Sequence, residues 1–282
     1  MQVLVAKHSG FCEGVERAFR IAQETAIQGG TVYMLGNLVH NKQVVNKLKE
    51  KGVISVASLT EIPPANTGIL LISAHGVGPD IYKEAEAKGL KIIDTTCPWV
   101  KKAQKIAGDL AAKGCLVIIF GDVGHAEVAG LVGWSRGQAL IIQTINEAND
   151  LRLDPAKQLG LIAQTTQSEE LFKQIAAALN KRFPSLEIHD TICGATSKRQ
   201  EAAIDLAKQV DLMIIIGDQL SANTKRLTEL CTRTGTKTYQ IETVNDLKHD
   251  WLKSVNKIGI TAGASTPEWI VQEVIRGLQS AH

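Results

Sequence analysis

The sequence predicts an α/β protein built from three related small units, each with its own parallel sheet. Short apolar runs alternate with amphipathic helical patterns along the whole chain. The same order of elements recurs three times, with repeated cysteines 85 and 96 residues apart, at positions 12, 97 and 193. We therefore expect units at residues 1–96, 97–192 and 193–282, arranged around a pseudo-threefold axis with a central cavity.

In each repeat the recurring order of elements contains a cysteine that precedes a helical pattern. Ala, Ile and Leu recur at helical spacing there, with Lys, Arg, Glu and Gln on the opposite face. Pro98, directly after Cys97, suits the first turn of a helix. The predicted helices span residues 15–28, 100–113 and 197–209.

A nearly continuous apolar run follows each of these helices, which is typical of a parallel strand buried on both faces. These first strands cover residues 31–35, 116–120 and 212–216, and each is followed by a glycine. A helix and a second strand come next, with the strands near residues 53–56, 140–142 and 238–241. Third strands at residues 69–72, 159–162 and 257–260 each lead into another helix.

Composition excludes several classes of protein. The 282 residues are 44% hydrophobic and 21% charged, and a formal charge of +2 does not favour nucleic acid or an anionic membrane as the main partner. No apolar run reaches the roughly 18–20 residues that span a bilayer. The apolar stretch in the first residues is too short for a signal sequence and resembles a strand. We therefore expect a cytoplasmic protein.

The five cysteines form no CxxC pair and are odd in number, which fits neither a disulfide framework nor a zinc ribbon. Cys115 and Cys231 lie in apolar patterns and are interpreted as structural thiols. Cys12, Cys97 and Cys193 occupy equivalent repeat positions, and three thiolates suggest a soft metal or an iron–sulfur cluster. A [4Fe–4S] cluster held by only three cysteines would leave one iron open to substrate.

Polar side chains recur at the predicted carboxyl ends of the strands, where α/β proteins place their sites. His40, His125 and Ser221 each lie four residues after the glycine that ends a first strand, and Glu127 and Asn223 lie six after it. The loops after the third strands add further donors, namely His75, Thr165, Thr166 and Ser265. Imidazoles, amides and hydroxyls in this number suit a diphosphate or similar small anion.

Glu127 is the only carboxylate among these loop positions. Beside a metal cluster and several histidines, a carboxyl group is suited to donate a proton to substrate. Lys and Arg do not occur in the set, so anion binding would depend partly on histidine protonation. The chain also has no GxxxxGK[ST] motif, which argues against a P-loop nucleotide site.

In order and spacing these motifs resemble the 4-hydroxy-3-methylbut-2-enyl diphosphate reductases over nearly the whole chain. The motifs are Gly-Phe-Cys12-x-Gly-Val, Leu-Val-His40-Asn, Ser-Ala-His75-Gly-Val, Asp-Thr-Thr-Cys97-Pro, Gly-His125-x-Glu127-Val, Gln-Thr165-Thr166, Thr-Ile-Cys193-x-Ala-Thr, Ser221-x-Asn223 and Thr-Ala-Gly-Ala-Ser265.

The resemblance implies an iron–sulfur oxidoreductase that performs the last step of the methylerythritol phosphate route to isoprenoids. It implies a [4Fe–4S] cluster on Cys12, Cys97 and Cys193, and reductive loss of the substrate hydroxyl to give isopentenyl and dimethylallyl diphosphate. It also implies a ferredoxin or flavodoxin as electron donor. The implied diphosphate ligands are His40, His75, Ser221, Asn223 and Ser265, with a contribution from His125. Glu127, assisted by Thr165, would supply protons.

Two positions depart from the family pattern. Ala222 stands where a second serine commonly precedes the asparagine, and a lost hydrogen bond to a charged group is worth roughly 1.5–3 kcal/mol. Ala126 follows His125 where proline is frequent. We expect weaker substrate binding from the first departure and a slightly looser Glu127 loop from the second.

Two other functions account for part of the pattern. A non-catalytic iron–sulfur sensor or carrier would explain the three cysteines, although it leaves the polar lining unexplained. A mononuclear metal hydrolase could use His40, His75, His125 and Glu127, and one zinc per chain without sulfide would indicate it.

Overall fold

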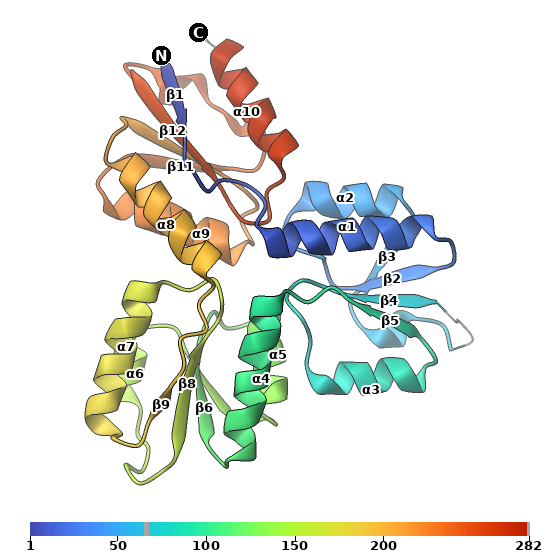
Figure 1. Cartoon of the computed structure of the whole chain (residues 1–282). Coiled ribbons are helices and arrows are strands. Elements are labelled where there is room, and N and C mark those ends of the chain that lie inside the picture. Colours follow the sequence, from blue (N-terminus) through green and yellow to red (C-terminus); the bar gives the residue numbers. More distant parts are fainter. Residues whose placement is uncertain (65–67, 281–282) are drawn as a thin grey trace. The chain divides into compact units, whose positions relative to one another are not determined.

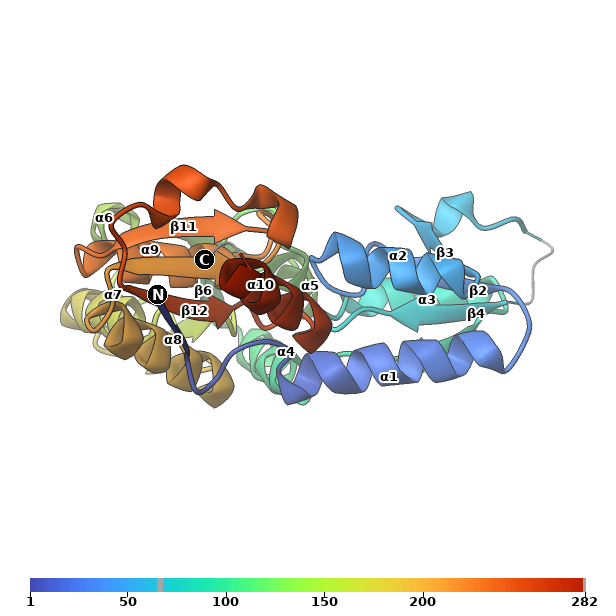
Figure 2. The ribbon, with the colours of Figure 1, turned by 90° about the horizontal axis from the view of Figure 1, so that it is seen from above.

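The computed structural model describes residues 1–64 and 68–280. They form three four-stranded parallel sheets flanked by helices (Figure 1), with strand orders β3-β2-β4-β5, β7-β6-β8-β9 and β1-β12-β10-β11. In Figure 2 the arrows of β11 and β12 point the same way, as their parallel pairing with β10 requires. The α/β class and the three parallel sheets are therefore confirmed, whereas the packing about a threefold axis stays a prediction.

The bounds of the elements agree closely with the periodicity of the sequence. The first sheet and its helices are α1 Glu13–Ile27, β2 Val32–Leu35, α2 Lys42–Glu50, β3 Val53–Val56, η1 Leu59–Glu61, β4 Ile69–Ile72, α3 Pro79–Ala87 and β5 Lys91–Asp94. The second are α4 Pro98–Ala112, β6 Leu116–Phe120, α5 Ala126–Trp134, β7 Ala139–Ile142, α6 Ile145–Asp150, β8 Leu159–Ala163, α7 Glu169–Arg182 and β9 Glu187–Ile188. The third are β1 Gln2–Val5, α8 Gly194–Ala207, β10 Leu212–Ile216, α9 Ala222–Arg233, β11 Lys237–Ile241, η2 Val244–Asp246, η3 His249–Leu252, β12 Lys257–Ala262 and α10 Glu268–Ser280.

Each sheet has a fourth strand, at its edge, that lies outside the repeat pattern. Of these, β1 (Gln2–Val5) confirms the strand expected from the first residues of the chain, whereas β5 and β9 were not predicted. β5 carries Lys91 and Asp94, and β9 has two residues, so neither has the apolar run by which the other strands were found. The first strand of the chain, β1, pairs in parallel with β12 and so extends the sheet of residues 212–262. The unit boundaries at residues 96 and 192 remain a prediction.

Helices pack on both faces of each sheet, which explains the continuous apolar strands. All five residues of β10 are buried. In the second sheet, Leu110 and Leu131 of α4 and α5 pack on one face, while Phe172 and Leu179 of α7 pack on the other. The first sheet has α3 on one side and α1 and α2 on the other (Figure 1). Helices α8 and α9 cover one face of the third sheet, and α10 covers the other.

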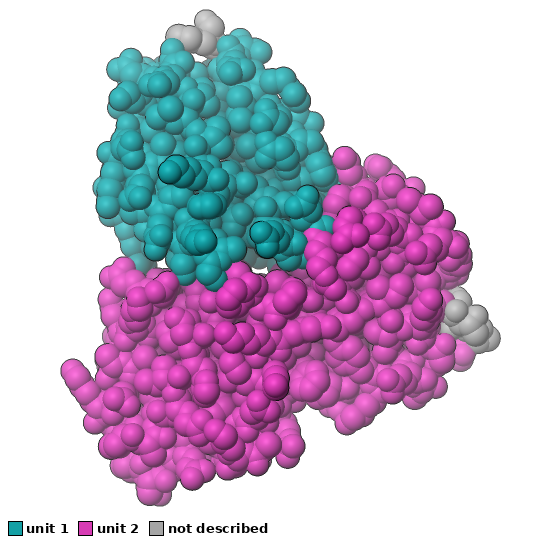
Figure 3. Space-filling model, viewed as in Figure 1, with its two compact units in different colours: residues 1–16, 39–45, 194–282 teal, residues 17–38, 46–193 magenta. Residues whose placement is uncertain are grey.

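The chain divides into two compact units, coloured separately in Figure 3. Unit 1 contains residues 1–16, 39–45 and 194–282, and unit 2 contains residues 17–38 and 46–193. Residues 39–45, which include His40, therefore group with the third sheet rather than with the strands that precede and follow them. Across the described residues, no helix combines the length and apolar character needed to cross a membrane.

Candidate active site

The three repeated cysteines have equivalent backbone surroundings. The N–H of Cys97 donates to the carbonyl of Ala74 (3.0 Å), and the N–H of Cys193 donates to that of Thr165 (3.0 Å). The N–H of Cys12 donates to the carbonyl of Ala264 (3.2 Å). Each acceptor lies in the loop after the central third strand, and each cysteine is partly exposed and directly precedes a helix. The helices α1, α4 and α8 thus begin two or three residues earlier than periodicity predicted, immediately after each cysteine.

Local hydrogen bonds shape the chain before two of the cysteines in the same way. A side-chain oxygen of Asp94 accepts the N–H of Thr96 (2.9 Å), and Asp190 likewise accepts the N–H of Ile192 (2.9 Å). The hydroxyls of Thr95 and Thr191 donate to the carbonyls of the neighbouring strands at 2.5 Å. The repeated Asp-Thr-x-Cys motif is therefore a turn that fixes where the thiol is presented.

Asp94 also connects this turn to the helices beside it. Its Oδ2 accepts hydrogen bonds from Lys101 Nζ (2.7 Å) and Tyr82 Oη (3.2 Å). Burial pushes the pKa of Asp94 up, but the Lys101 ammonium and the Thr96 donors outweigh it and lower the pKa. Burial, with Asp94 nearby, raises the pKa of Tyr82 to about 12. Asp94 is thus ionised and holds the Cys97 turn.

Cys115 and Cys231 have the buried, apolar surroundings that the sequence predicts for them. Both are almost fully buried, at 2% and 0% exposure. Burial raises the pKa of the Cys231 thiol to about 12 and also raises that of Cys115. Both therefore remain neutral thiols and are poor candidates for metal ligands.

Glu127 is a buried carboxyl group held at both oxygens by one residue. Oε1 accepts the N–H of Thr165 (2.6 Å) and Oε2 accepts its hydroxyl (2.9 Å). Burial raises the pKa of Glu127 to about 7, the Thr165 donors oppose the shift, and Asp122 adds to it. A carboxyl group with this pKa carries its proton in a large fraction of molecules near neutral pH, so it can donate a proton.

Two histidines lie next to this pair. Nδ1 of His125 accepts the N–H of Glu127 (3.1 Å) and so caps α5, while the rings of His125 and His75 meet edge to face at 5.1 Å. Gly76 turns the chain after His75 with a φ of +70°. The carbonyl of Val77 then accepts the indole N–H of Trp134 (2.9 Å), which fixes the His75 turn against α5.

A buried polar network, which the sequence patterns did not predict, connects the loop after β6 with the loop after β8. The Asp122 N–H donates to Gln164 Oε1 (2.8 Å), and Gln167 Nε2 donates to Asp122 Oδ1 (3.1 Å). Gln164 Nε2 donates to the hydroxyl of Thr166 (2.9 Å). Gln164 and Gln167 are at most 1% exposed. The repeated Gly-Asp after the first strands, at Asp122 and Asp218, is the one signal in the sequence that points to this network.

In unit 1, three of the predicted anion ligands are joined by hydrogen bonds. The Ser265 hydroxyl lies 3.1 Å from the His40 carbonyl oxygen, to which it can donate, and 3.3 Å from the Ser221 hydroxyl. Ser221 caps α9 by accepting the N–H of Thr224 (3.4 Å). These contacts place hydroxyl groups at the N-terminus of a helix, where partial positive charge favours an anion.

Asn223, on the first turn of α9, is the most informative residue of this group. It is 4% exposed, and neither atom of its side-chain amide has a hydrogen-bond partner among the described residues. Leaving a buried polar group unsatisfied costs about 1–3 kcal/mol. A polar ligand that reached Asn223 would offset this cost.

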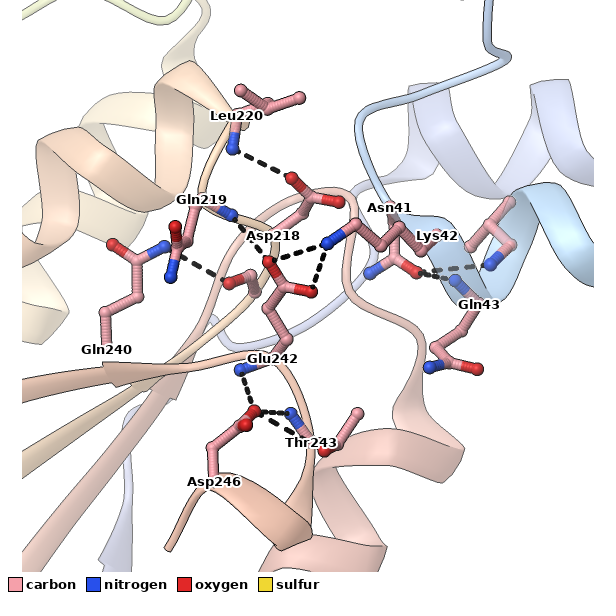
Figure 4. Close-up of polar contacts among 12 residues, drawn as sticks. Asn41, Lys42, Gln43, Asp218, Gln219, Leu220, Gln240, Glu242, Thr243 and Asp246 are labelled. Atoms are coloured by element: carbon pink, nitrogen blue, oxygen red, sulfur yellow. Dashed lines mark hydrogen bonds and ion pairs between the residues drawn. The ribbon is translucent and has the colours of Figure 1, made fainter.

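The segment that carries His40 is attached to unit 1 by further polar contacts (Figure 4). Lys42 Nζ forms an ion pair with Glu242 Oε2 (3.0 Å), and Glu242 Oε1 also accepts the N–H of Gln219 (3.4 Å). Asn41 caps α2 by accepting the N–H groups of Gln43 and Val44, at 3.0 and 3.1 Å.

The capping pattern differs from the equivalence of His40, His125 and Ser221 that their spacing from the glycines predicts. His125 and Ser221 cap their helices, so their structural counterpart in the first repeat is Asn41, and His40 lies one residue before it. Burial lowers the pKa of His40, with Asp218 opposing the shift and Lys225 adding to it. His40 is therefore mainly neutral at neutral pH.

The predicted site residues thus form two sets. Unit 1 holds Cys12, His40, Ser221, Asn223 and Ser265, and unit 2 holds His75, Cys97, His125, Glu127, Thr165, Thr166 and Cys193. Within the residues that the structure describes, no three His, Cys, Asp or Glu side chains are grouped so that they could hold a metal ion.

Comparison with known proteins identifies the family. The model of the LytB protein family matches residues 3–279. The 4-hydroxy-3-methylbut-2-enyl diphosphate reductase of Clostridioides difficile is 43% identical over 281 residues, which cover 99% of this chain and 100% of that protein. That of Geotalea uraniireducens is also 43% identical, over 99% of this chain and 97% of its own.

A solved structure gives the same result for the fold. The E-1-hydroxy-2-methyl-but-2-enyl-4-diphosphate reductase from Plasmodium falciparum matches with a TM-score of 0.93 at 32% identity, covering 98% of this chain and 87% of that one. The resemblance inferred from the sequence motifs is confirmed. Because the match in sequence and fold extends over almost the whole chain, the chain belongs to the LytB protein family and is an oxidoreductase.

Proposed function

We propose that the enzyme reduces (E)-4-hydroxy-3-methylbut-2-enyl diphosphate to isopentenyl and dimethylallyl diphosphate, the last step of the methylerythritol phosphate pathway. In this reaction the allylic C–O bond breaks, a C–H bond forms, and water leaves. Two electrons and two protons are consumed per substrate. The names of the relatives support the substrate, and the chemistry of the two site sets supports the division of work described below.

The observation that carries the proposal is the pairing of Glu127 with Thr165. A buried carboxyl group with a pKa of about 7 can hold a proton in the absence of bulk water and release it to the substrate. The Thr165 donors, at 2.6 and 2.9 Å, fix both oxygens, so the proton would be delivered from one orientation. A sensor or carrier of clusters would have no need of such a group.

Unit 1 supplies the groups that would hold the diphosphate. Asn223 has an unsatisfied buried amide, Ser221 and Ser265 present hydroxyls, and α9 begins at the same point. The first N–H groups of a helix have no acceptor within it, so the backbone N–H of Ala222 can replace part of the missing serine hydroxyl. His40 is neutral in the free enzyme and would take up a proton as the anion binds. In unit 2, His75 and His125 would complete the contacts to the substrate.

The cysteines fit an iron–sulfur cluster by their donor chemistry and their surroundings. Cys12, Cys97 and Cys193 are partly exposed thiols with matching backbone contacts, whereas the other two cysteines are buried and neutral. We propose that these three hold a [4Fe–4S] cluster. When bound, the cluster supplies electrons and an iron with an open position for the substrate hydroxyl. All five cysteines are thiols, in keeping with a reducing cytoplasm, and a ferredoxin or flavodoxin is the proposed electron donor.

An anaerobic reconstitution experiment tests the proposal. The protein is loaded with iron and sulfide, analysed for both elements and by electron paramagnetic resonance, and assayed with the allylic diphosphate and reduced methyl viologen. We expect a brown protein with about four irons and four sulfides per chain and turnover of the substrate. A colourless protein, or one with a single zinc and no sulfide, would contradict the proposal.

Cysteine variants separate the cluster ligands from the structural thiols. Replacing Cys97 by Ser should abolish a stable cluster and turnover together. The matched control, Cys231→Ala, should keep the iron and sulfide content of the wild type, because Cys231 is buried against Ala203 of α8. Equal iron content in the two variants would remove Cys97 from the ligand set.

A further inference from the structure

Helix α4, which begins directly after Cys97, presents a basic and aromatic face to solvent. Lys101, Lys102 and Lys105 are exposed, and the Trp99 side chain is 42% exposed. Lys102 Nζ lies 5.3 Å from the centre of the Trp99 ring. Residues three and four apart lie together on a helix, so these four side chains form one continuous surface, which we call the α4 face.

The helices after the other two cysteines lack this surface. The first turn of α1 has Glu13 and Glu16, and the exposed Lys198 of α8 is followed one turn later by the exposed Glu201. Acidic residues are favoured in the first turn of a helix, and α4 has none there. Lysines so near the N-terminus oppose the helix dipole, so local helix stability does not account for them.

A hollow of about 490 Å³ adjoins the α4 face. Lys101 and Lys105 line it together with Tyr82 of α3 and Trp134 of α5, and two acidic groups, Asp94 and Asp109, also lie on its wall. Asp94 is already paired with Lys101 at 2.7 Å. The hollow offers aromatic walls next to ammonium groups, which suits an acidic side chain of a protein partner.

We propose that the α4 face is the docking surface for a small acidic protein that carries one electron at a time. Two such carriers would each lose one electron for every substrate molecule reduced. The allylic C–O bond would break, a C–H bond would form, and two protons would be consumed as water leaves. The inference rests on the proposed function, because it assigns the entry of electrons to the side of Cys97. Clustered lysines attract an acidic partner at long range, and an exposed tryptophan is typical of the contact region of interfaces.

The test compares a protein donor with a small chemical reductant. The variant Lys102→Glu/Lys105→Glu leaves the Lys101–Asp94 ion pair intact, and it is assayed after loading with the cluster. With reduced ferredoxin as donor, we expect kcat/KM of Lys102→Glu/Lys105→Glu to fall roughly tenfold or more below that of the wild type. In the neutral variant Lys102→Gln/Lys105→Gln, kcat/KM should fall less. With reduced methyl viologen, both variants should match the wild type. Trp99→Ala should also lower only the ferredoxin-supported rate.

A second pair of lysines provides the matched control. Lys47 and Lys49 are exposed on the last turns of α2, which leads into β3, so they lie at the amino ends of the strands, whereas Cys97 follows a carboxyl end. Lys47→Glu/Lys49→Glu makes the same change in charge and should leave both rates unchanged. Raising the salt concentration should lower the ferredoxin-supported rate of the wild type more than that of Lys102→Glu/Lys105→Glu.

Three results would overturn the docking proposal. The first is an equal loss of rate with ferredoxin and with methyl viologen in Lys102→Glu/Lys105→Glu. The second is an equal loss of the ferredoxin-supported rate in the control variant Lys47→Glu/Lys49→Glu. The third is a wild-type dimer in light scattering that Lys102→Glu/Lys105→Glu converts to monomers. Failure of the wild type to turn over the substrate with methyl viologen would instead contradict the proposed function itself.

Discussion

The two site sets differ in the kind of polar group that they contain. In unit 1, hydroxyls, an amide and a neutral imidazole surround the start of α9, and a buried amide is left without a partner among the described residues. In unit 2, a carboxyl group is fully satisfied by Thr165, and its loop is braced by buried glutamines. The groups of the first set suit an anionic ligand, and the raised pKa of Glu127 in the second set suits a proton donor.

Under the proposed function, diphosphate binding depends mainly on unit 1, with His75 and His125 of unit 2, and proton transfer depends on Glu127. A binding group contributes most to ligand affinity when it has no hydrogen-bond partner before the ligand binds, as at the side-chain amide of Asn223 among the described residues. A group that transfers a proton contributes most to the rate when its position and pKa are set before the substrate binds, as at Glu127. Substitution of a binding group of unit 1 such as Asn223 should therefore raise KM, whereas substitution of Glu127 in unit 2 should lower kcat.

The largest effect is expected from Glu127→Gln. Gln keeps the size of the side chain but cannot donate the proton, so kcat should fall by roughly a factor of 100 to 10,000, with iron and sulfide content unchanged. Single-turnover reduction of the allylic diphosphate measures it. The exposed Glu170 of α7 is the matched control, and Glu170→Gln should behave as the wild type. An unaltered kcat in Glu127→Gln would remove Glu127 from the reaction.

Asn223→Ala should act mainly on binding. A hydrogen bond to a charged group is worth about 1.5–3 kcal/mol, so KM should rise by roughly 10- to 100-fold while kcat changes far less. Steady-state assays of this variant should be paired with Asn149→Ala, which alters an exposed side chain of α6. A fall in kcat at constant KM would contradict the division of work between the two sets.

The pH dependence of stability should distinguish Glu127 from an ordinary carboxyl group. Its pKa is about 7 in the folded protein, against an ordinary value of 4.5 for the unfolded chain, so the neutral form stabilises the fold fully below about pH 4.5. That contribution is lost as the pH rises through about 7, and amounts to on the order of 3 kcal/mol. Thermal unfolding from pH 5 to about pH 8.5 should show a steeper loss in the wild type than in Glu127→Gln. Parallel curves would indicate an ionised Glu127 throughout.

The smallest effect is expected from Ala222→Ser. Ala222 is the first residue of α9 and is partly exposed, so a serine there would present a hydroxyl beside Ser221 and Asn223. KM should fall by a few-fold, which is less than a full charged hydrogen bond because the backbone N–H already serves. Binding of inorganic diphosphate by calorimetry provides an independent measure. A higher KM would show that the position has no room for a donor.

Much of this could be predicted from residue order alone. Continuous apolar runs such as residues 212–216 identified buried parallel strands, because a strand covered on both faces has no polar side. The repeat placed Cys97 and Cys193 at matching loops, and the local hydrogen bonds of the Asp-Thr-x-Cys motif bear this out. The edge strands β5 and β9 could not be found, since one strand is charged at both ends and the other has two residues.

The sequence by itself determined the fold class, the repeat and the residue types at the strand ends, because periodicity and loop chemistry are local properties. Only the tertiary structure decided that β1 completes the sheet of residues 212–262 and that His40 groups with Ser265 of unit 1. It also decided the state of Glu127. Its pKa depends on how completely the surrounding chain excludes water and on where Thr165 directs its donors, and neither is encoded in a motif.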